Sequence, residues 1–451
     1  MKLKPIALAA TGALGVCLIH PAFASSNDQQ AVRADKTSVA QKMAAMQAHI
    51  DDMQKQLDAM RLAQPGEPAA SAAIQPARAK SAAAVKEIAL AQNKPAPKED
   101  GIKVGGAVRF QYSNESYNKG NQHRGGDGDF DIFRLDLNGS IGGVELSAQY
   151  RWFQYMSAIH HAWVGYKFSD TSEGRLGITK LPFGVQPFDS HNYFFSSNYY
   201  LGLEDSYNMG VKYIYKNDPW NVQLAFFKND SMGGVDGYVG NRSDSYTYNV
   251  VGVRSRGEGI YATPLHPIGT VNTAAARVAY TFKPGADTSI EVGASGLHGG
   301  LNNSTSSVGH YDAYALHMNA YHGPWNLQLQ ATRYHYAVDN GATRLAVGAY
   351  HFYDSIAARA NSYTGNIAYK WPVSWGPITA LTFYNDYSLI NHKSGGLPQT
   401  WMNVSGVSVA AGGLFTYFDF VSGRNQPFIG GTMAGDGKVE HRFNINFGYY
   451  F

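Results

Sequence analysis

The chain has little cysteine, little charge and no long apolar segment. Its one cysteine, Cys17, falls within the first 24 of 451 residues, so the remainder has no thiol for a disulfide, for covalent catalysis or for a metal. Charged residues make up only 16% of the chain, against about 25% in ordinary soluble domains. A formal net charge of +3 gives no basic excess of the kind that nucleic-acid binding requires. The apolar run from Ile6 to Ile19 is shorter than the roughly 20 residues of a membrane-spanning helix.

The first 100 residues are predicted to form three segments. Residues 1–24 combine two lysines, the apolar run and the small-x-small site Ala22-Phe23-Ala24, which is typical of a cleavable signal peptide rather than a membrane anchor. Residues 25–63 are expected to form a short periplasmic coiled-coil helix, with an isolated amphipathic helix as the alternative. Residues 64–100, rich in Ala, Pro and Lys, are predicted to be a flexible linker. The apolar positions of the heptad pattern are Val39, Met43, Met46, Ile50, Met53, Leu57 and Met60.

From residue 101 to residue 451 apolar and polar residues alternate with a period of two, which predicts strands. Abundant aromatic residues, 13% of the chain, fit strands whose apolar faces meet lipid. In the last segment, residues 443–451, every second side chain is apolar. Sixteen segments show the pattern, which predicts an all-β fold, a 16-stranded antiparallel transmembrane β-barrel over residues 101–451. The other fifteen are Val104–Tyr112, Phe133–Leu137, Val144–Trp152, Ala162–Phe168, Leu176–Ile178, Met209–Tyr215, Trp220–Phe226, Ala276–Phe282, Ile290–Ala294, Leu316–Ala320, Trp325–Ala331, Gly365–Tyr369, Leu381–Phe383, Met402–Val409 and Leu414–Phe420.

The connections between these segments are predicted to alternate between short turns and longer loops, as in bacterial outer-membrane barrels. Leu345–Tyr353 is assigned to a long outer loop, with a helical turn as one form, because a seventeenth strand would give the wrong parity. The predicted turns are Gly139–Gly143, Asp170–Gly174, Asn217–Pro219, Pro284–Asp287, His322–Pro324, Trp371–Gly376 and Ala410–Gly413. The predicted long loops include Asn114–Gly128, Leu181–Ser206, Asn229–Asn272, His298–Tyr311 and Val421–Glu440.

A barrel of sixteen strands leaves a water-filled lumen, whereas eight strands fill their own interior. Leu181–Ser206 is the predicted constriction loop, because its many aromatic side chains would be costly in water and favour packing against the inner wall. A compact cap over the mouth is the alternative. The residues singled out in or beside this loop are Lys180, Pro182, Phe183, Gly184, His191 and Tyr193.

Positions between the lipid-facing residues are expected to face the lumen and to give it a modest basic excess. For each basic residue, a salt bridge that only stiffens the wall is the alternative. Arg134 with Glu145, and Arg151 with Asp136, are the two such pairs expected across the Gly139–Gly143 hairpin. The candidate pore-lining and solute-binding residues are Arg109, Arg134, Arg151, Lys167, Arg175, Lys212 and Arg277, with Arg442 in the same phase. The acids of that phase are Asp136, Glu145, Glu291, Asp386 and Asp419.

Three other patterns are weak. Asp127, Asp129 and Asp131 resemble the start of a calcium loop but lack its later Gly and Glu, so a solvated loop edge is expected, with adventitious binding of a divalent ion as the alternative. Adjacent strand residues point to opposite faces, so the pair His160-His161 is not expected to share a metal. His191 and His317 are the candidates for solute contact or a pH response, with a polar residue of the wall as the alternative for each. No metal, cofactor or enzymatic activity is predicted, since no nucleophile elbow, zinc helix or phosphate-binding glycine loop occurs.

The heptad helix, the Lys180-Leu181-Pro182-Phe183-Gly184 start of the third loop and the closing residues Asn444–Phe451 together resemble trimeric outer-membrane porins related to the phosphate-selective O/P group. Within it the chain looks closest to dicarboxylate-type porins that carry a coiled coil. The resemblance implies a homotrimer in the outer membrane of a Gram-negative bacterium, each subunit with its own pore. The third loop lacks Arg and Lys, which departs from the phosphate-selective pattern.

The sequence therefore predicts a porin for passive diffusion of small hydrophilic solutes, with mild preference for organic or inorganic anions such as dicarboxylates or phosphate. The alternative is a structural or adhesive outer-membrane barrel in which conduction is incidental. Small solutes, outer-membrane lipid and two further copies of the chain are the expected partners.

Overall fold

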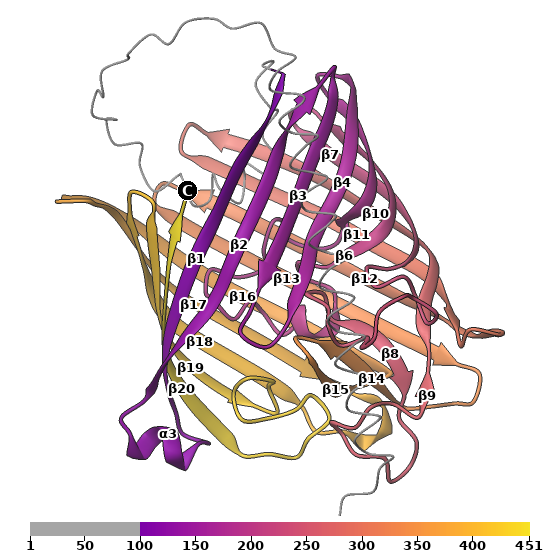
Figure 1. The fold of residues 1–451 in the computed structure, drawn as a ribbon. Coiled ribbons are helices and arrows are strands. Elements are labelled where there is room, and N and C mark those ends of the chain that lie inside the picture. The colour runs from indigo at the N-terminus through magenta and orange to yellow at the C-terminus, as the bar shows by residue number, and fades with distance from the viewer. Residues whose placement is uncertain (1–99) are drawn as a thin grey trace, which may run out of the picture. The chain divides into compact units, whose positions relative to one another are not determined.

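Sixteen antiparallel strands form a ring that closes where β1 pairs with β20 (Figure 1). The computed structural model describes residues 100–451, so the predicted signal peptide, coiled coil and linker lie outside the described residues. None of the described helices is long and apolar enough to span a membrane. The barrel strands are β1(Gly101–Glu115), β2(Asp127–Ile141), β3(Val144–Trp152), β4(Ser157–Ser169), β5(Ser172–Lys180), β6(Tyr207–Lys216), β7(Trp220–Asp230), β10(Gly269–Gly285), β11(Thr288–Asn302), β12(Ser307–His322), β13(Trp325–Val338), β16(Arg359–Trp375), β17(Ile378–Asn391), β18(Thr400–Ala411), β19(Leu414–Arg424) and β20(Val439–Tyr450).

Four further strands form a separate sheet in the order β15-β14-β8-β9. They are β8(Asn249–Val253), β9(His266–Pro267), β14(Arg344–Ala349) and β15(Phe352–Ala357). The short helices are α3(Lys119–His123), η1(Tyr199–Leu201) and η2(Ser394–Gly396).

The alternation that predicts the strands is inverted relative to a soluble protein. On β13, Trp325, Leu327 and Leu329 are exposed on the outside, at 47%, 38% and 44% of their surface, whereas the intervening Asn326, Gln328 and Gln330 are buried. A barrel in lipid requires this arrangement, because apolar side chains face hydrocarbon and polar ones face the interior. The predicted sixteen-stranded barrel is therefore confirmed.

Aromatic side chains pair on the outer surface beside the short turns. Trp220 packs against Tyr280 with ring centroids 4.8 Å apart, and Trp325 against Tyr369 at the same distance. Both tryptophans are the first residues of their strands. Such rings belong to the interface between hydrocarbon and headgroups.

Two expectations about the loops are wrong. His298–Tyr311 is not a long loop, since β11 and β12 continue through it and leave only residues 303–306 between them. The side chain of Asn303 closes this turn by accepting the N–H of Ser306 at 2.9 Å. Leu345–Tyr353 is not a strand of the ring, as predicted, but it contains most of β14 and the start of β15 rather than a helical turn. The reason is that β14 pairs with β8, about 95 residues earlier in the chain, a partner that no local pattern reveals.

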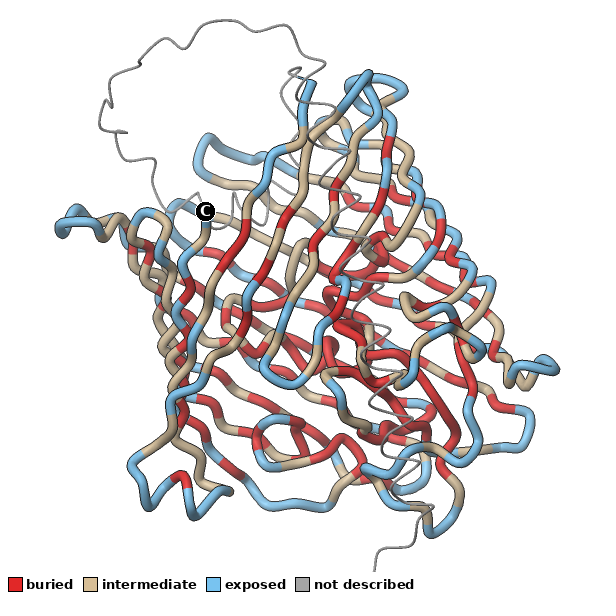
Figure 2. Tube along the Cα trace, in the orientation of Figure 1, coloured by how far each residue is buried: buried red, intermediate tan, exposed pale blue. Residues whose placement is uncertain are grey.

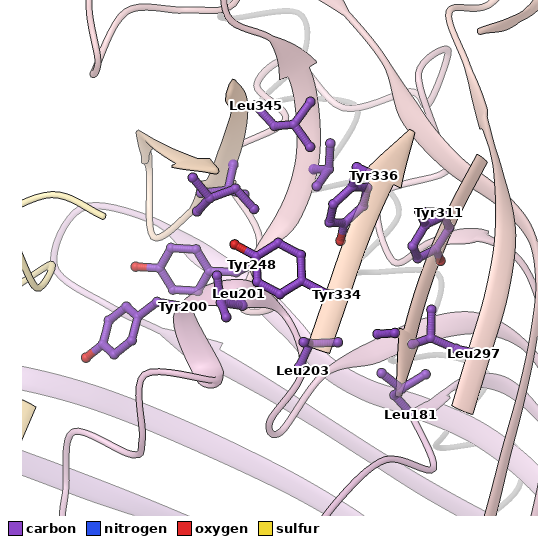
Figure 3. Close-up of a cluster of buried hydrophobic side chains, with 14 of the residues drawn as sticks. Leu181, Tyr200, Leu201, Leu203, Tyr248, Leu297, Tyr311, Tyr334, Tyr336 and Leu345 are labelled. Atoms are coloured by element: carbon purple, nitrogen blue, oxygen red, sulfur yellow. The ribbon is translucent and has the colours of Figure 1, made fainter. Parts of the chain in front are cut away.

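The interior of the ring is partly filled. Figure 2 shows buried residues on the segments inside the barrel and exposed residues at the turns. A large apolar cluster joins the loop between β5 and β6 to the separate sheet and to the inner wall, where Leu201, Leu203, Tyr248 and Tyr334 are all buried (Figure 3). This packing fixes the loop that the sequence singles out.

Candidate solute channel

The segment 181–206 between β5 and β6 lies inside the barrel. Its two ends are joined by a hydrogen bond of 2.8 Å from the Leu181 N–H to the Ser206 carbonyl. Side chains along it, including Leu181, Phe183, Tyr199 and Tyr200, are at most 5% exposed. We call this segment the inner loop.

The first part of the inner loop is bound to two parts of the wall, β11 and β13. The Gly184 N–H donates to Ser295 Oγ on β11 at 3.0 Å, and the Val185 N–H donates to Gln330 Oε1 on β13 at 2.8 Å. Gly184 has a φ of +60°, and a Cβ there would lie 2.1 Å from Gln330 Oε1. Only glycine satisfies both the left-handed backbone and the close approach, which gives the Pro-Phe-Gly motif a structural reason.

The middle of the inner loop is held by carboxylates of the far wall. Asp386 on β17 accepts a hydrogen bond of 2.6 Å from the backbone N–H of His191 and is also hydrogen-bonded to His191 Nδ1 at 2.7 Å. It also accepts the N–H and the side-chain amide of Asn192, at 3.1 and 2.7 Å. The Tyr193 N–H donates to Asp419 on β19 at 3.3 Å. The Tyr193 hydroxyl donates to Asp131 on β2 at 3.0 Å, so the loop spans the interior.

The last part of the inner loop is held by Asp205. Lys180 Nζ lies 2.5 Å from Asp205 Oδ1 and also donates to the Pro187 carbonyl at 2.6 Å. The hydroxyls of Tyr207 and Tyr246 donate to the same carboxylate at 2.9 and 2.7 Å. Lys180 therefore ties the beginning of the loop to its end, and its charge is neutralised there.

A cavity of about 850 Å³ lies between the inner loop and the wall. Four arginines on neighbouring strands line one side of it: Arg442 on β20, Arg109 on β1, Arg134 on β2 and Arg151 on β3. Pro187, Phe188, His191, Tyr193 and other inner-loop residues line it too. Lys370 on β16 reaches the cavity from the far side of the ring. The inner loop thus narrows the lumen opposite an arginine-lined wall.

The arginines of this wall do not form the ion pairs expected from the sequence. Arg134 lies 2.6 Å from Asp136, two residues along its own strand, and not against Glu145. Glu145 instead lies 2.5 Å from Lys167. Arg151 donates to Gln149 Oε1 at 2.7 Å and does not reach Asp136. Residues two apart on a strand share a face, so same-strand pairing competes with cross-strand pairing.

The four other predicted basic residues lie away from the cavity. Lys167 is paired with Glu145, and Arg175 with Glu173 on its own strand. Lys212 Nζ donates to the Lys180 carbonyl at 3.1 Å. Arg277 Nε donates to the Gly184 carbonyl at 2.7 Å and its Nη2 lies against Glu291. Lys212 and Arg277 thus contact the chain at or near the inner loop.

For several residues the structure differs from the role that the sequence predicts. Asp127, Asp129 and Asp131 are part of β2 rather than a loop edge, and Asp129 and Asp131 line the cavity. His160 and His161 do not point to opposite faces. The register shift opposite Gln149 and Tyr150 inserts His160 as a bulge, and the two Nδ1 atoms lie 2.8 Å apart.

The histidines and acids form no metal site in the described part of the chain: no group of three or more His, Cys, Asp or Glu there is arranged to hold an ion. His160 lies 3.4 Å from Asp205. His317 is buried beside Arg277 and Glu291, away from the cavity. Of the two predicted histidine contacts, only His191 lines the cavity.

The segment 425–438 between β19 and β20 contributes Phe428 to the cavity and is fixed at Met433. The Met433 N–H donates to Asp354 Oδ2 on β15 at 3.2 Å, and its carbonyl accepts from Lys393 Nζ at 2.6 Å. Burial raises the pKa of Asp354 to about 6 and lowers the pKa of Lys393 to about 7. Both groups are more easily neutralised here than in water.

Solved structures similar to this chain include three bacterial proteins. OprB of Pseudomonas putida is 9% identical, with a TM-score of 0.50 and coverage of 78% of this chain and 94% of its own. An anion-selective porin from Comamonas acidovorans is 12% identical, with a TM-score of 0.48 and coverage of 78% and 100%. The outer membrane channel DcaP of Acinetobacter baumannii is 10% identical, with a TM-score of 0.47 and coverage of 79% and 99%. At such identities the likeness to OprB bears on the fold alone.

No curated protein matches the sequence significantly. The family model of the phosphate-selective porins O and P matches residues 102–353, which is more than half of the 451 residues. The matched residues include the inner loop and three of the four cavity arginines. The chain therefore belongs to the phosphate-selective porin O and P family and is an outer-membrane porin of a Gram-negative bacterium that forms a channel for small solutes.

Proposed function

We propose that this porin lets small hydrophilic solutes diffuse passively, with a mild preference for anions. The observation that carries the proposal is the arginine wall formed by Arg442, Arg109, Arg134 and Arg151 on one side of the cavity. Fixed charges beside a narrow aqueous path raise the local concentration of ions of opposite sign. Organic anions such as dicarboxylates and inorganic anions such as phosphate are both candidate solutes.

Strict selection of phosphate is not proposed. The inner loop, residues 181–206, contains neither Arg nor Lys, so the side of the cavity that it forms adds no positive side chain. Acids such as Asp131 also lie on the arginine wall. A balance of both signs favours a graded preference over exclusive binding of one anion.

The functional unit is proposed to be a homotrimer. Residues 25–63 carry the heptad pattern, and three heptads gain stability when several copies associate. In this proposal three helices pair in the periplasm next to three barrels. Deletion of residues 25–63 is expected to weaken the trimer in native electrophoresis without abolishing conduction.

Planar-bilayer recording tests the proposed function. The purified protein is expected to insert in steps of three equal conductances, and a gradient of potassium chloride is expected to give a reversal potential of the sign for anion preference. A cation-selective channel would overturn the anion preference. A correctly folded barrel that passes no current would favour the structural or adhesive alternative.

A further inference from the structure

Although four arginines line the cavity, they do not contribute equally to its charge. Arg109 lies 2.7 Å from Asp131, Arg134 lies 2.6 Å from Asp136, and Arg442 lies 3.2 Å from Glu115. From the lumen each of these pairs is a dipole, whose field falls off faster than that of a single charge. Three of the four arginines are therefore largely neutralised.

Arg151 differs from the other three. Among residues 100–451 no carboxylate oxygen lies within 4.0 Å of its guanidinium nitrogens. Its polar partner is the neutral side chain of Gln149, at 2.7 Å, and its guanidinium carbon lies 4.4 Å from the ring centroid of Tyr246. Gln149 in turn donates to Asp136 at 2.7 Å, so Gln149 connects Arg151 to an acid that Arg134 already neutralises.

The acids of the cavity near Arg151 are already paired. Asp205 lines the cavity, but its carboxylate lies 2.5 Å from Lys180 Nζ and accepts the Tyr246 hydroxyl. Asp129 is exposed at the mouth end of β2. Arg134 on the same strand lies directly opposite Arg151 on β3, and Asp129 is five residues before Arg134. Five residues of strand span roughly 17 Å, well beyond the Debye length of about 8 Å at physiological salt. Asp129 therefore does not cancel the charge of Arg151.

We infer that Arg151 is the specificity-determining residue of the arginine wall, the one of its four arginines whose charge sets the preference for small anions. The inference rests on the proposed anion preference and adds which residue produces it. Arg151 is half-buried, whereas Arg134 and Arg442 are buried. Stacking on Tyr246 also fixes its guanidinium in place. The side chain of Arg151 lines the cavity, and a guanidinium there can contact a passing carboxylate, chloride or phosphate.

The test compares permeability ratios of chloride and potassium from reversal potentials. A full charge about 6 Å from the ion path changes local ion concentration about threefold even at the dielectric constant of water. Arg151→Gln is therefore expected to lower the anion/cation ratio about threefold or more. Arg151→Lys keeps the charge and is expected to retain most of the wild-type ratio.

The matched control removes an arginine together with its acid. The double variant Arg442→Gln with Glu115→Gln leaves the net charge unchanged and is expected to change the ratio much less than Arg151→Gln does. Lys167→Gln with Glu145→Gln removes an ion pair that does not line the cavity and is expected to retain the wild-type ratio. Asp131→Asn removes the partner of Arg109 and is expected to raise the anion/cation ratio.

The inference is overturned if Arg151→Gln keeps the wild-type ratio, or if a neutral double variant lowers the ratio as much as Arg151→Gln does. The permeability ratio of the wild type alone tests the proposed function. A wild type without anion preference contradicts the proposed function. Even then Arg151→Gln must shift the ratio toward cations for the inference to hold.

Discussion

Arg277 Nε on β10 donates a hydrogen bond of 2.7 Å to the carbonyl oxygen of Gly184 in the inner loop. Arg277, which the sequence predicts to contact solutes, thus supports the loop that narrows the channel. Arg277→Gln is expected to loosen the first part of the loop and to increase single-channel conductance and current noise. A hydrogen bond from a charged donor contributes about 1.5–3 kcal/mol, so the melting temperature should fall as well.

Arg175→Gln is the control for this prediction. It removes the same charge from a wall pair, that of Arg175 with Glu173, away from the cavity. Its conductance is expected to match the wild type. Equal conductance and noise in Arg277→Gln and Arg175→Gln would contradict the anchoring role of Arg277.

Asp386 is predicted to be the strongest anchor of the inner loop, because it accepts four hydrogen bonds from His191 and Asn192. Asp386→Ala leaves these donors without their acceptor and is expected to destabilise the protein by about 3 kcal/mol or more. Asp386→Asn keeps one acceptor oxygen and should lie between Asp386→Ala and the wild type. Thermal unfolding in detergent and single-channel conductance give the two readouts. A wild-type melting temperature in Asp386→Ala would rule out this role.

Gly184→Ala is expected to disturb the inner loop more than backbone strain alone explains. A left-handed backbone costs a residue with a Cβ about 1–2 kcal/mol, and the new Cβ would also displace Gln330, which binds the Val185 N–H. Gly376→Ala is the matched control, since Gly376 has a similar φ of +58° but no atom within 4 Å of the added Cβ. The two variants should differ in conductance and melting temperature; identical changes would show that the Gln330 contact is unimportant.

The packing of segment 425–438 on the separate sheet is predicted to depend on pH through Asp354. Burial raises the pKa of Asp354 from 3.8 to about 6, so the folded state binds the proton more tightly than the unfolded state. The contribution of Asp354 to the stability of this packing is therefore highest below about pH 4, falls as pH rises to about 6, and is constant above. Lys393, whose pKa is lowered to about 7, adds stability only as pH rises above about 7. Two pKa units correspond to about 3 kcal/mol.

Limited proteolysis of segment 425–438 across this pH range measures the effect. The wild type is expected to be cleaved faster at pH 7 than at pH 4, after correction for the protease's own pH dependence. Asp354→Asn, which cannot titrate, should lose the difference. The same pH dependence in Asp354→Asn would assign the effect to another group.

The barrel could be predicted from sequence because its pattern is local. The exposed Leu327 and Leu329 and the buried Gln328 and Gln330 follow from alternation alone. Turns such as Gly142-Gly143 are equally local, because their positive φ values favour glycine. The number of strands and the position of the inner loop in the chain were therefore accessible.

The partners of each charged group could not be predicted in the same way. His191 binds Asp386, 195 residues later, and the choice of Asp136 over Glu145 as partner of Arg134 depends on side-chain geometry. The bulge at His160 shifts the register of β4 by one residue, which reverses the face expected from alternation. Long-range pairing and bulges leave no periodic signal, so the partners of the wall charges could not be inferred from the alternation.

Because β1 pairs with β20, the ring can close only late in folding. Ala107 lies opposite Tyr450, more than 300 residues away. Until the last strand arrives, β1 has an unpaired edge, and side chains such as Trp325 and Phe420 have neither lipid nor partner to cover them. The complete polypeptide therefore has to be exported unfolded, with its apolar side chains shielded. The barrel forms in the membrane only when β1 and β20 pair.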